Sequence, residues 1–183
     1  MRPLTFLALF ALSVVVWPDA GCSSSGSSVP PTDPEIVTPH APAAALPHGQ
    51  VVIEPPGREP VTFQVEVANE DRSRQRGLMF RRQMNADAGM LFLFDEEEHM
   101  SFWMHNTYLP LDMVFITSAM RVLGVAENAE PLTDDPREVE GDSKYVLELN
   151  AGTTRRFGIG PGAQVRFVGV PQVAEPRGGG HEE

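Results

Sequence analysis

Polar side chains that interrupt apolar stretches are the residues of this sequence most suited to binding or catalysis. A charged or hydrogen-bonding group near a core needs a partner, so it either pairs within the protein or faces a ligand. On this basis we expect a small ligand-binding site made of seven residues: Arg76, Met79, Trp103, Met104, Asn106, Thr107 and Asp112. In this hypothesis Arg76 approaches Asp112, and Asn106 joins them above a floor formed by the methionines and Trp103. The alternative is a buried structural pair of Arg76 and Asp112, with Asn106 capping a turn.

Catalysis is a second hypothesis, in which Asp112 and His105 serve a small hydrolase or lyase. The domain has no G-x-S-x-G elbow, no H-E-x-x-H pair and no phosphate-binding loop, and it has no cysteine, because the one cysteine of the chain, Cys22, lies at the end of the leader. We therefore favour a non-catalytic role. An open cleft that joins Asp112 and His105 would favour the enzyme instead.

Methionine and histidine side chains suggest a third hypothesis, a copper site, because thioether and imidazole ligands suit Cu(I). The potential ligands are Met79, Met84, Met90, His99, Met100, Met104, His105 and Met113. Alternation along a strand places Met100 and Met104 on the face opposite His99 and His105, and methionine at strand spacing usually fills a core. We therefore predict no metal and no cofactor, with copper binding as an alternative.

The net charge of -11 argues against a nucleic-acid partner, because binding phosphates requires a basic face. The nearest approach to a basic cluster is the short run from Arg74 to Arg82. With a single cysteine, the chain also cannot form an internal disulfide.

The first 22 residues have the layout of an export signal. One arginine precedes an apolar run from Leu4 to Trp17, and small residues lead to Cys22. We expect residues 1–21 to be a signal peptide and Cys22 to carry a lipid, as in bacterial lipoproteins. Ser23 follows the cysteine in place of the aspartate that would suggest retention in the inner membrane. These features predict an exported protein in the cell envelope, anchored through Cys22 to the outer membrane and facing the periplasm.

The rest of the chain divides into a tether, one domain and a tail. Residues 22–49 are rich in Ser and Pro and lack a periodic apolar face, so we expect a disordered tether after the lipidated cysteine. Residues 50–171 are long enough for one domain with its own core. The sequence AEPRGGGHEE dominates residues 172–183, which we expect to be a disordered tail.

Alternating apolar residues predict short strands throughout the domain. The expected strands cover 51–54, 61–68, 90–94, 100–106, 113–117, 122–130, 145–149 and 164–170. Asn69 offers an N-cap for a short helix through Arg76, and Gly77 can end that helix with a positive φ. Residues 151–157 form a second short helix or a turn, and residues 131–143 an acidic loop. This pattern favours a mainly β fold, a compact β-sandwich, jelly-roll-like domain or barrel with one or two short helices.

Several motifs in a fixed order resemble one family of bacterial and archaeal proteins, the domain-of-unknown-function family numbered 192. The motifs are Arg76-Gly77-Leu78-Met79, Gly89-Met90-Leu91-Phe92, Phe102-Trp103-Met104, Asn106-Thr107, Pro110-Leu111-Asp112, Tyr145-Val146-Leu147-Glu148-Leu149 and Gly152. The resemblance covers roughly residues 60–170. It implies a compact, β-rich, jelly-roll-like domain that is often exported, and it implies no established activity.

Together these observations predict an envelope lipoprotein that acts as a binding or accessory module. The partner of such a module is a small molecule, a glycan or an envelope protein, besides the membrane that holds the lipid anchor. A module that acts by contact alone would show an exposed apolar patch in place of a cavity. The sequence identifies no reaction and no ligand.

Overall fold

The computed structural model describes residues 45–171. The predicted signal peptide, Cys22, most of the predicted tether and the predicted tail lie outside the described residues. β1 begins at His48, and Leu46 already packs against core residues. No helix within residues 45–171 has the length and apolar character needed to cross a membrane.

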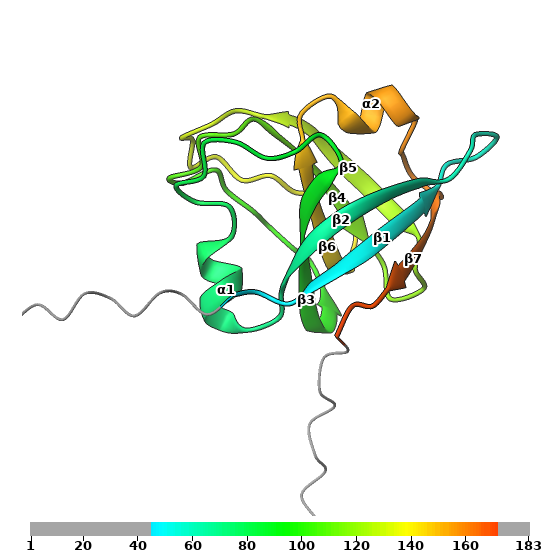
Figure 1. The fold of residues 1–183 in the computed structure, drawn as a ribbon, viewed down its shortest axis with the longest axis horizontal. Helices are drawn as coiled ribbons and strands as arrows, with labels where there is room; N and C mark the ends of the chain where they lie inside the picture. Colours follow the sequence, from blue (N-terminus) through cyan, green and yellow to red (C-terminus); the bar gives the residue numbers. More distant parts are fainter. Residues whose placement is uncertain (1–44, 172–183) are drawn as a thin grey trace, which may run out of the picture. The chain divides into compact units, whose positions relative to one another are not determined.

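The domain is mainly β and contains two short helices, as predicted (Figure 1). In chain order its elements are β1 (His48–Glu54), β2 (Val61–Ala68), α1 (Asp71–Arg76), β3 (Ala88–Glu98), β4 (Leu111–Ile116), β5 (Val122–Ala129), β6 (Ser143–Asn150), α2 (Thr153–Phe157) and β7 (Gln164–Val168). The strand expected over residues 100–106 is absent. Only Phe102 forms a bridge there, with Arg137.

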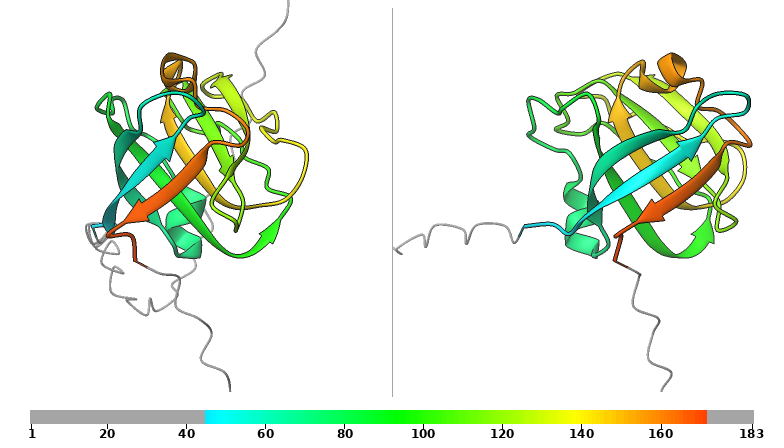
Figure 2. Two further views of the ribbon diagram at one scale, coloured as in Figure 1. Left: turned by 90° about the vertical axis from the view of Figure 1, so that its right-hand side faces the viewer. Right: turned by 45° about the vertical axis from the view of Figure 1, so that its right-hand side comes forward.

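The seven strands form one curled sheet in the order β5-β4-β6-β3-β2-β1-β7, which amounts to half of a barrel (Figure 2). All neighbours are antiparallel except β2 and β3, whose parallel pairing follows from the crossover through α1. Near the starts of the edge strands β5 and β7 two backbone bonds join the edges locally, from Val122 N–H to Ala163 O and from Val165 N–H to Met120 O. The sheet therefore has a concave face and a convex face.

Each face of the sheet carries its own core. Alternate residues of all seven strands fill the concave face, among them Phe63, Leu91, Val114 and Leu147. The intervening residues of the central strands β3, β4 and β6 form the convex face, which α1 and the loops cover. Burial of both faces explains why β4, LDMVFI, is buried at every position and shows no alternation. Which face a polar side chain enters then decides its surroundings.

Candidate functional site

A cavity of about 370 Å³ lies on the convex face, between α1, the segment 100–107 and the sheet. This volume is at the lower end of the range for small-molecule sites. Its apolar and aromatic lining comes from Leu78, Met79, Phe92, Phe94, Met100, Phe102 and Trp103. Its charged lining is confined to Asp71, Arg74 and Arg76 of α1 and Glu148 of β6. The cavity is thus apolar with a small number of ionisable groups.

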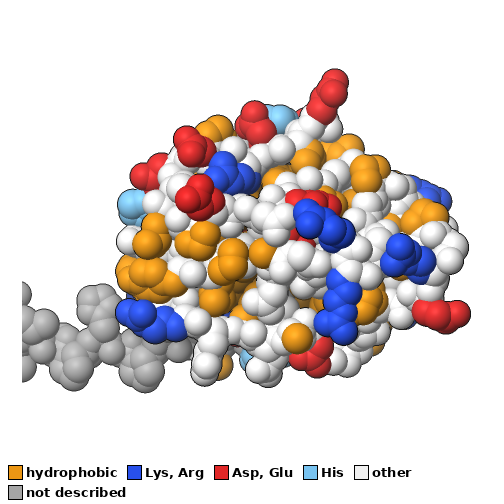
Figure 3. Space-filling model, turned by 90° about the horizontal axis from the view of Figure 1, so that it is seen from above, with side chains coloured by type: hydrophobic (Ala, Val, Ile, Leu, Met, Phe, Trp, Pro, Cys, Tyr) orange, Lys and Arg blue, Asp and Glu red, His pale blue; other side chains and the backbone are white. Residues whose placement is uncertain are grey.

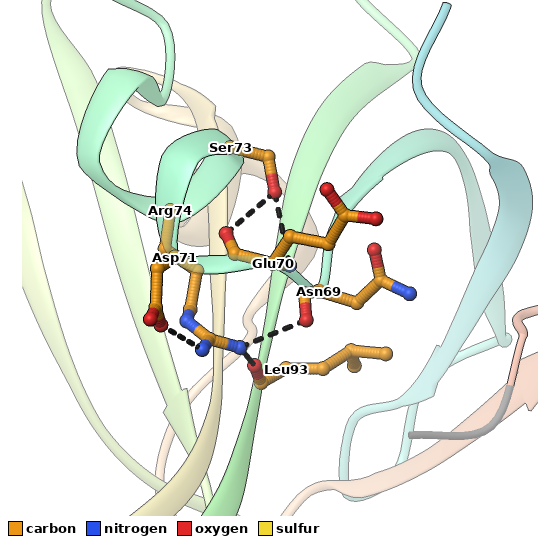
Figure 4. A network of polar contacts seen from close by, with 6 residues as sticks. All are labelled: Asn69, Glu70, Asp71, Ser73, Arg74 and Leu93. Atoms are coloured by element: carbon orange, nitrogen blue, oxygen red, sulfur yellow. Dashed lines mark hydrogen bonds and ion pairs between the residues drawn. The ribbon is translucent and has the colours of Figure 1, made fainter. Parts of the chain in front are cut away.

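α1 is fixed at its start by a local network, drawn in Figure 4. Ser73 Oγ donates to Glu70 O at 2.8 Å and accepts from Glu70 N at 3.1 Å, so Glu70 is the N-cap, and the expected cap at Asn69 is wrong. Arg74 Nη1 donates to the carbonyls of Asn69 and Leu93, at 3.0 and 2.8 Å, and Nη2 pairs with Asp71 at 2.5 Å. These bonds tie the helix to β3 and leave Arg74 and Asp71 neutralised by each other.

Backbone bonds to the acidic loop position the segment opposite α1. Phe102 exchanges N–H and carbonyl bonds with Arg137, at 2.9 and 2.7 Å, and Met104 N–H donates to Thr133 O at 2.9 Å. The expected alternation along this segment holds even without a strand, since Met100 and Met104 are buried and Trp103 is 60% exposed. Phe102 meets Phe92 edge to face, with ring centroids 5.0 Å apart. Residues 100–107 therefore form one wall of the cavity and leave Trp103 at its mouth.

Glu148 is the unusual residue of this site. Its side chain is buried on β6 and lines the cavity, and within residues 45–171 its Oε2 atom has no hydrogen-bond partner. Burial in this apolar setting raises the pKa of Glu148 to about 8. The group is therefore mostly protonated at neutral pH when the cavity is empty. A buried carboxyl without a partner costs stability, which is the usual sign of a functional group.

The seven residues predicted from the sequence divide between the cavity and its surroundings. Arg76, Met79, Trp103 and Thr107 line the cavity. Met104 is fully buried in the convex core, and Asn106 lies in a turn with a φ of 53°. Asp112 is buried elsewhere. The expected turn at Asn106 is present, and its carbonyl accepts a bond from Phe80 N–H at 2.9 Å.

Asp112 points to the concave side of β4, away from the cavity. Its Oδ2 accepts from Thr154 N at 2.9 Å and Thr154 Oγ1 at 2.7 Å, and its Oδ1 accepts from Asn128 N at 2.9 Å. The expectation that Arg76 approaches Asp112 is therefore wrong, because the two residues serve opposite faces of the sheet. Asp112 is a buried structural residue, as the alternative hypothesis expected, but its partners are Thr154 and Asn128 and not Arg76. It connects the start of α2 to β4 and β5.

The sequence hypothesis missed Glu148 and Arg74. The signal for Glu148 was present: its position alternates with Leu147 and Leu149 and follows Val146 by two, so this charge shares a face with a fully buried valine. An ionisable residue at a core-facing position of an apolar strand indicates either a pair or a site. Arg74 carried no comparable signal, because besides its i,i+3 pair with Asp71 its partners are the main-chain carbonyls of Asn69 and Leu93.

Within residues 45–171 the histidines do not join the methionines in one site. His99 Nδ1 lies 3.2 Å from Gly141 O, and His105 Nδ1 lies 2.8 Å from Asp134 Oδ1, both at the surface. Met90, Met100, Met104 and Met113 pack in the convex core. Among residues 45–171 no group of three or more His, Cys, Asp and Glu side chains is placed to hold a metal ion. Nor do Asp112 and His105 meet, because Asp112 faces the concave side.

An apolar surface borders the mouth of the cavity. Phe80, Trp103 and Leu132 are each more than half exposed, at 54%, 60% and 60%. Phe80 and Leu132 are held beside the same turn, by bonds from their N–H groups to Asn106 O and Thr107 O. Figure 3 shows hydrophobic side chains gathered at one end of the face seen from above. We refer to Phe80, Trp103 and Leu132 as the apolar rim.

Comparison with known proteins identifies the family. A family model, DUF192, described as uncharacterized ACR, matches residues 51–167, which is most of the described domain and includes the cavity. The chain belongs to this family. All four ionisable groups that line the cavity lie within the match, so the site is part of the DUF192 domain.

Two solved structures resemble this DUF192 domain. A candidate transcription regulator from Sinorhizobium meliloti 1021 is 40% identical, with a TM-score of 0.66 over 69% of this chain and 98% of that one. A protein of unknown function from Novosphingobium aromaticivorans DSM 12444 is 34% identical, with a TM-score of 0.65 over 69% of this chain and 89% of that one. No curated protein matches the chain. The comparisons therefore establish the family and leave its activity open.

Proposed function

We propose that this DUF192 protein is a membrane-tethered, non-catalytic binding module of the cell envelope, and that its cavity takes up a small molecule. The observation that carries the proposal is the unpartnered carboxyl of Glu148 in an apolar cavity. A group of this kind costs stability in the empty protein, and a ligand that bonds to it offsets that cost. The site is well placed for recognition because both of its walls are fixed by hydrogen bonds.

The chemistry of the lining supports binding over catalysis. The hydroxyl of Thr107 donates to His105 O at 3.2 Å, and Asp71 is held by Arg74. Among the described lining residues Glu148 is the one buried carboxyl, and the other acid, Asp71, is exposed and paired with Arg74. Hydrolases and lyases commonly combine such a group with a second acid, base or nucleophile that is free to act on the substrate.

The membrane attachment in this proposal is supported by the sequence alone, through the export signal and Cys22. Lipidation at Cys22 would keep the domain near the membrane, within reach of the tether predicted from the sequence. The test is partition of the full-length protein between aqueous and detergent phases. We expect the protein in the detergent phase and its Cys22→Ser variant in the aqueous phase. A variant that stays in the detergent phase would contradict lipid anchoring at Cys22.

Occlusion of the cavity tests the binding role. Small amines, carboxylic acids, alcohols and sugars are screened for a rise in melting temperature, and the active compounds are retested on Ser101→Trp, which places an indole at a lining position. A ligand at one hundred times its Kd stabilises the native state by about 2.7 kcal/mol. We expect Ser101→Trp to abolish the rise and His105→Trp, at an exposed position off the lining, to retain it. Equal rises in both variants would contradict the cavity as the site.

The apolar rim supports a second candidate, an accessory protein that acts by contact with an envelope protein. Phe80 and Leu132 lie outside the lining of the cavity, so changing both to Ser separates the two functions. If the double variant loses the cellular function of the protein and keeps ligand binding, contact is the function. If Ser101→Trp alone loses it, binding is the function.

A further inference from the structure

The interior of the cavity contains one polar group that needs a partner, the Glu148 carboxyl. Its walls offer few hydrogen-bonding groups to a ligand. Glu148 is buried and unpartnered, while the walls around it are Phe92, Phe94, Phe102, Trp103 and two methionines. A ligand group that enters must compensate the carboxyl and must leave few polar atoms of its own unpaired. A neutral apolar group fails the first condition, and a strongly hydrogen-bonding group such as a sugar hydroxyl cluster fails the second.

A quaternary ammonium group that carries three methyl groups meets both conditions. Its positive charge compensates an ionised carboxylate at close range, and it has no N–H donors to satisfy. Its methyl groups are compatible with aromatic walls, which attract cations through their ring faces. The protein already uses one of these walls in this way, since the Arg74 guanidinium carbon lies 5.4 Å from the centre of the Phe94 ring.

The mouth of the cavity carries a positive charge, which favours a negatively charged group on the ligand. Arg76 lines the cavity and is exposed, and within residues 45–171 its side chain forms no ion pair. A simple cation would be repelled by this arginine, whereas an acid group on the same ligand would be attracted. The two ends of the site therefore differ in sign, with a carboxyl inside and a guanidinium outside.

We propose that the cavity binds a small zwitterion whose methylated ammonium group contacts Glu148 and whose acid group meets Arg76. This inference rests on the proposed binding function and names its ligand class. On binding, the Glu148 carboxyl loses its proton to solvent and becomes the counter-ion of the ammonium group. No bond forms or breaks in the ligand.

Proton release gives the ligand class a distinctive pH dependence. The charged groups around the cavity are Asp71, Arg74 and Arg76 of α1, and the described segment 100–107 and the strands β3 and β4 contribute no charged group to its lining. The pKa of Glu148 is raised by desolvation alone. Because the ammonium requires the ionised carboxylate, affinity should rise about tenfold per pH unit from pH 6 to pH 8 and then level off.

The test is calorimetric titration of the full-length protein with glycine betaine and with 3,3-dimethylbutanoate. These two probes have the same shape, and the second lacks the positive charge because a carbon replaces the nitrogen. We expect betaine to bind at pH 8 at least tenfold more tightly than 3,3-dimethylbutanoate, with about one proton released at pH 7. Glu148→Gln should lose at least tenfold in affinity for betaine and should lose the pH dependence.

Two surface variants protect the test against a folding defect in Glu148→Gln. Trp103→Ala removes an exposed aromatic wall and should weaken betaine binding severalfold, while Tyr108→Ala, exposed and outside the lining, should leave it unchanged. Equal or tighter binding of 3,3-dimethylbutanoate would overturn the zwitterion class and leave the binding module intact. Binding of neither probe would also overturn the class, and the screen with Ser101→Trp then decides the binding function separately.

Discussion

Two buried carboxyl groups lie on opposite faces of the same sheet and have opposite surroundings. Asp112 is fully buried on the concave side and accepts three hydrogen bonds. Glu148 is buried on the convex side, and its Oε2 atom has no partner within the described residues. The Asp112 carboxylate is hydrogen-bonded within the protein and stabilises the fold, whereas the Glu148 carboxyl is free to bond to a ligand. Burial alone therefore does not separate structural from functional acids, but hydrogen-bond satisfaction does.

The largest effect should come from removing the satisfied acid. Asp112→Ala leaves the N–H groups of Asn128 and Thr154 and the Thr154 hydroxyl without their acceptor. We expect the free energy of unfolding to fall by about 3–5 kcal/mol in urea denaturation. Asp95→Ala, at an exposed aspartate of β3, should change it by less than about 0.5 kcal/mol. Similar small effects for both substitutions would remove the structural role of Asp112.

The unsatisfied acid should show an effect that, unlike that of Asp112, depends on pH. The native pKa of Glu148 is about 8, above its ordinary value of 4.5, so its contribution to stability is present at low pH and is lost as pH rises from 4.5 to 8. Relative to Glu148→Gln, the wild-type protein should lose about 1.4 kcal/mol per pH unit over this window. The measurement is thermal or urea unfolding of both proteins at several pH values. A stability difference that stays constant with pH would contradict the buried, unpaired state.

Removing one of the hydrogen bonds to Asp112 should lower the free energy of unfolding by less than removing Asp112 itself. Thr154→Val keeps the shape of the side chain and removes the hydroxyl that donates to Asp112 at 2.7 Å. We expect a loss of about 1–2 kcal/mol, measured by chemical denaturation. Thr153→Val, at the neighbouring position, should cost less than about 0.5 kcal/mol, because the Thr153 hydroxyl is not among the hydrogen-bond donors to Asp112. A larger loss of stability in Thr153→Val than in Thr154→Val would contradict the hydrogen bond from Thr154 to Asp112.

The smallest effect on stability is expected at the mouth of the cavity. Arg76→Gln removes an exposed guanidinium that has no ion pair within residues 45–171, so unfolding should change by less than about 0.5 kcal/mol. Affinity for glycine betaine should nevertheless fall severalfold in calorimetry. Arg72→Gln, an exposed arginine of α1 outside the lining, should affect neither quantity. An unfolding change of several kcal/mol at Arg76 would assign it a structural role.

The sequence predicted what depends on local pattern. Alternation located β2 at its observed bounds, 61–68, and placed β1, β4, β5, β6 and β7 within a few residues. Four of the seven expected site residues line one cavity because α1 and the segment 100–107 are short, locally defined pieces of chain. The apolar character of residues 145–149 also identified β6. The same apolar pattern drew attention away from Glu148, the one charged residue within 145–149.

The partners of each acid could not be predicted, because they depend on long-range pairing. Asp112 meets Thr154 only because β4 lies beside β6 and α2 follows β6, a topology that strand patterns do not determine. The side of the sheet that each acid enters follows from the register of Asp112 opposite Leu149 and of Met113 opposite Glu148. A one-residue change in that register would have brought Asp112 to the cavity, where the sequence hypothesis had placed it.

Titration of the Glu148 carboxyl by ¹³C NMR tests the central claim most directly. With the resonance assigned through Glu148→Gln, we expect a midpoint near pH 8 in the free domain. Saturating glycine betaine should lower that midpoint, because the ammonium group stabilises the ionised form. A midpoint near 4.5 in the free domain, unaffected by the ligand, would contradict an unpartnered carboxyl in the cavity.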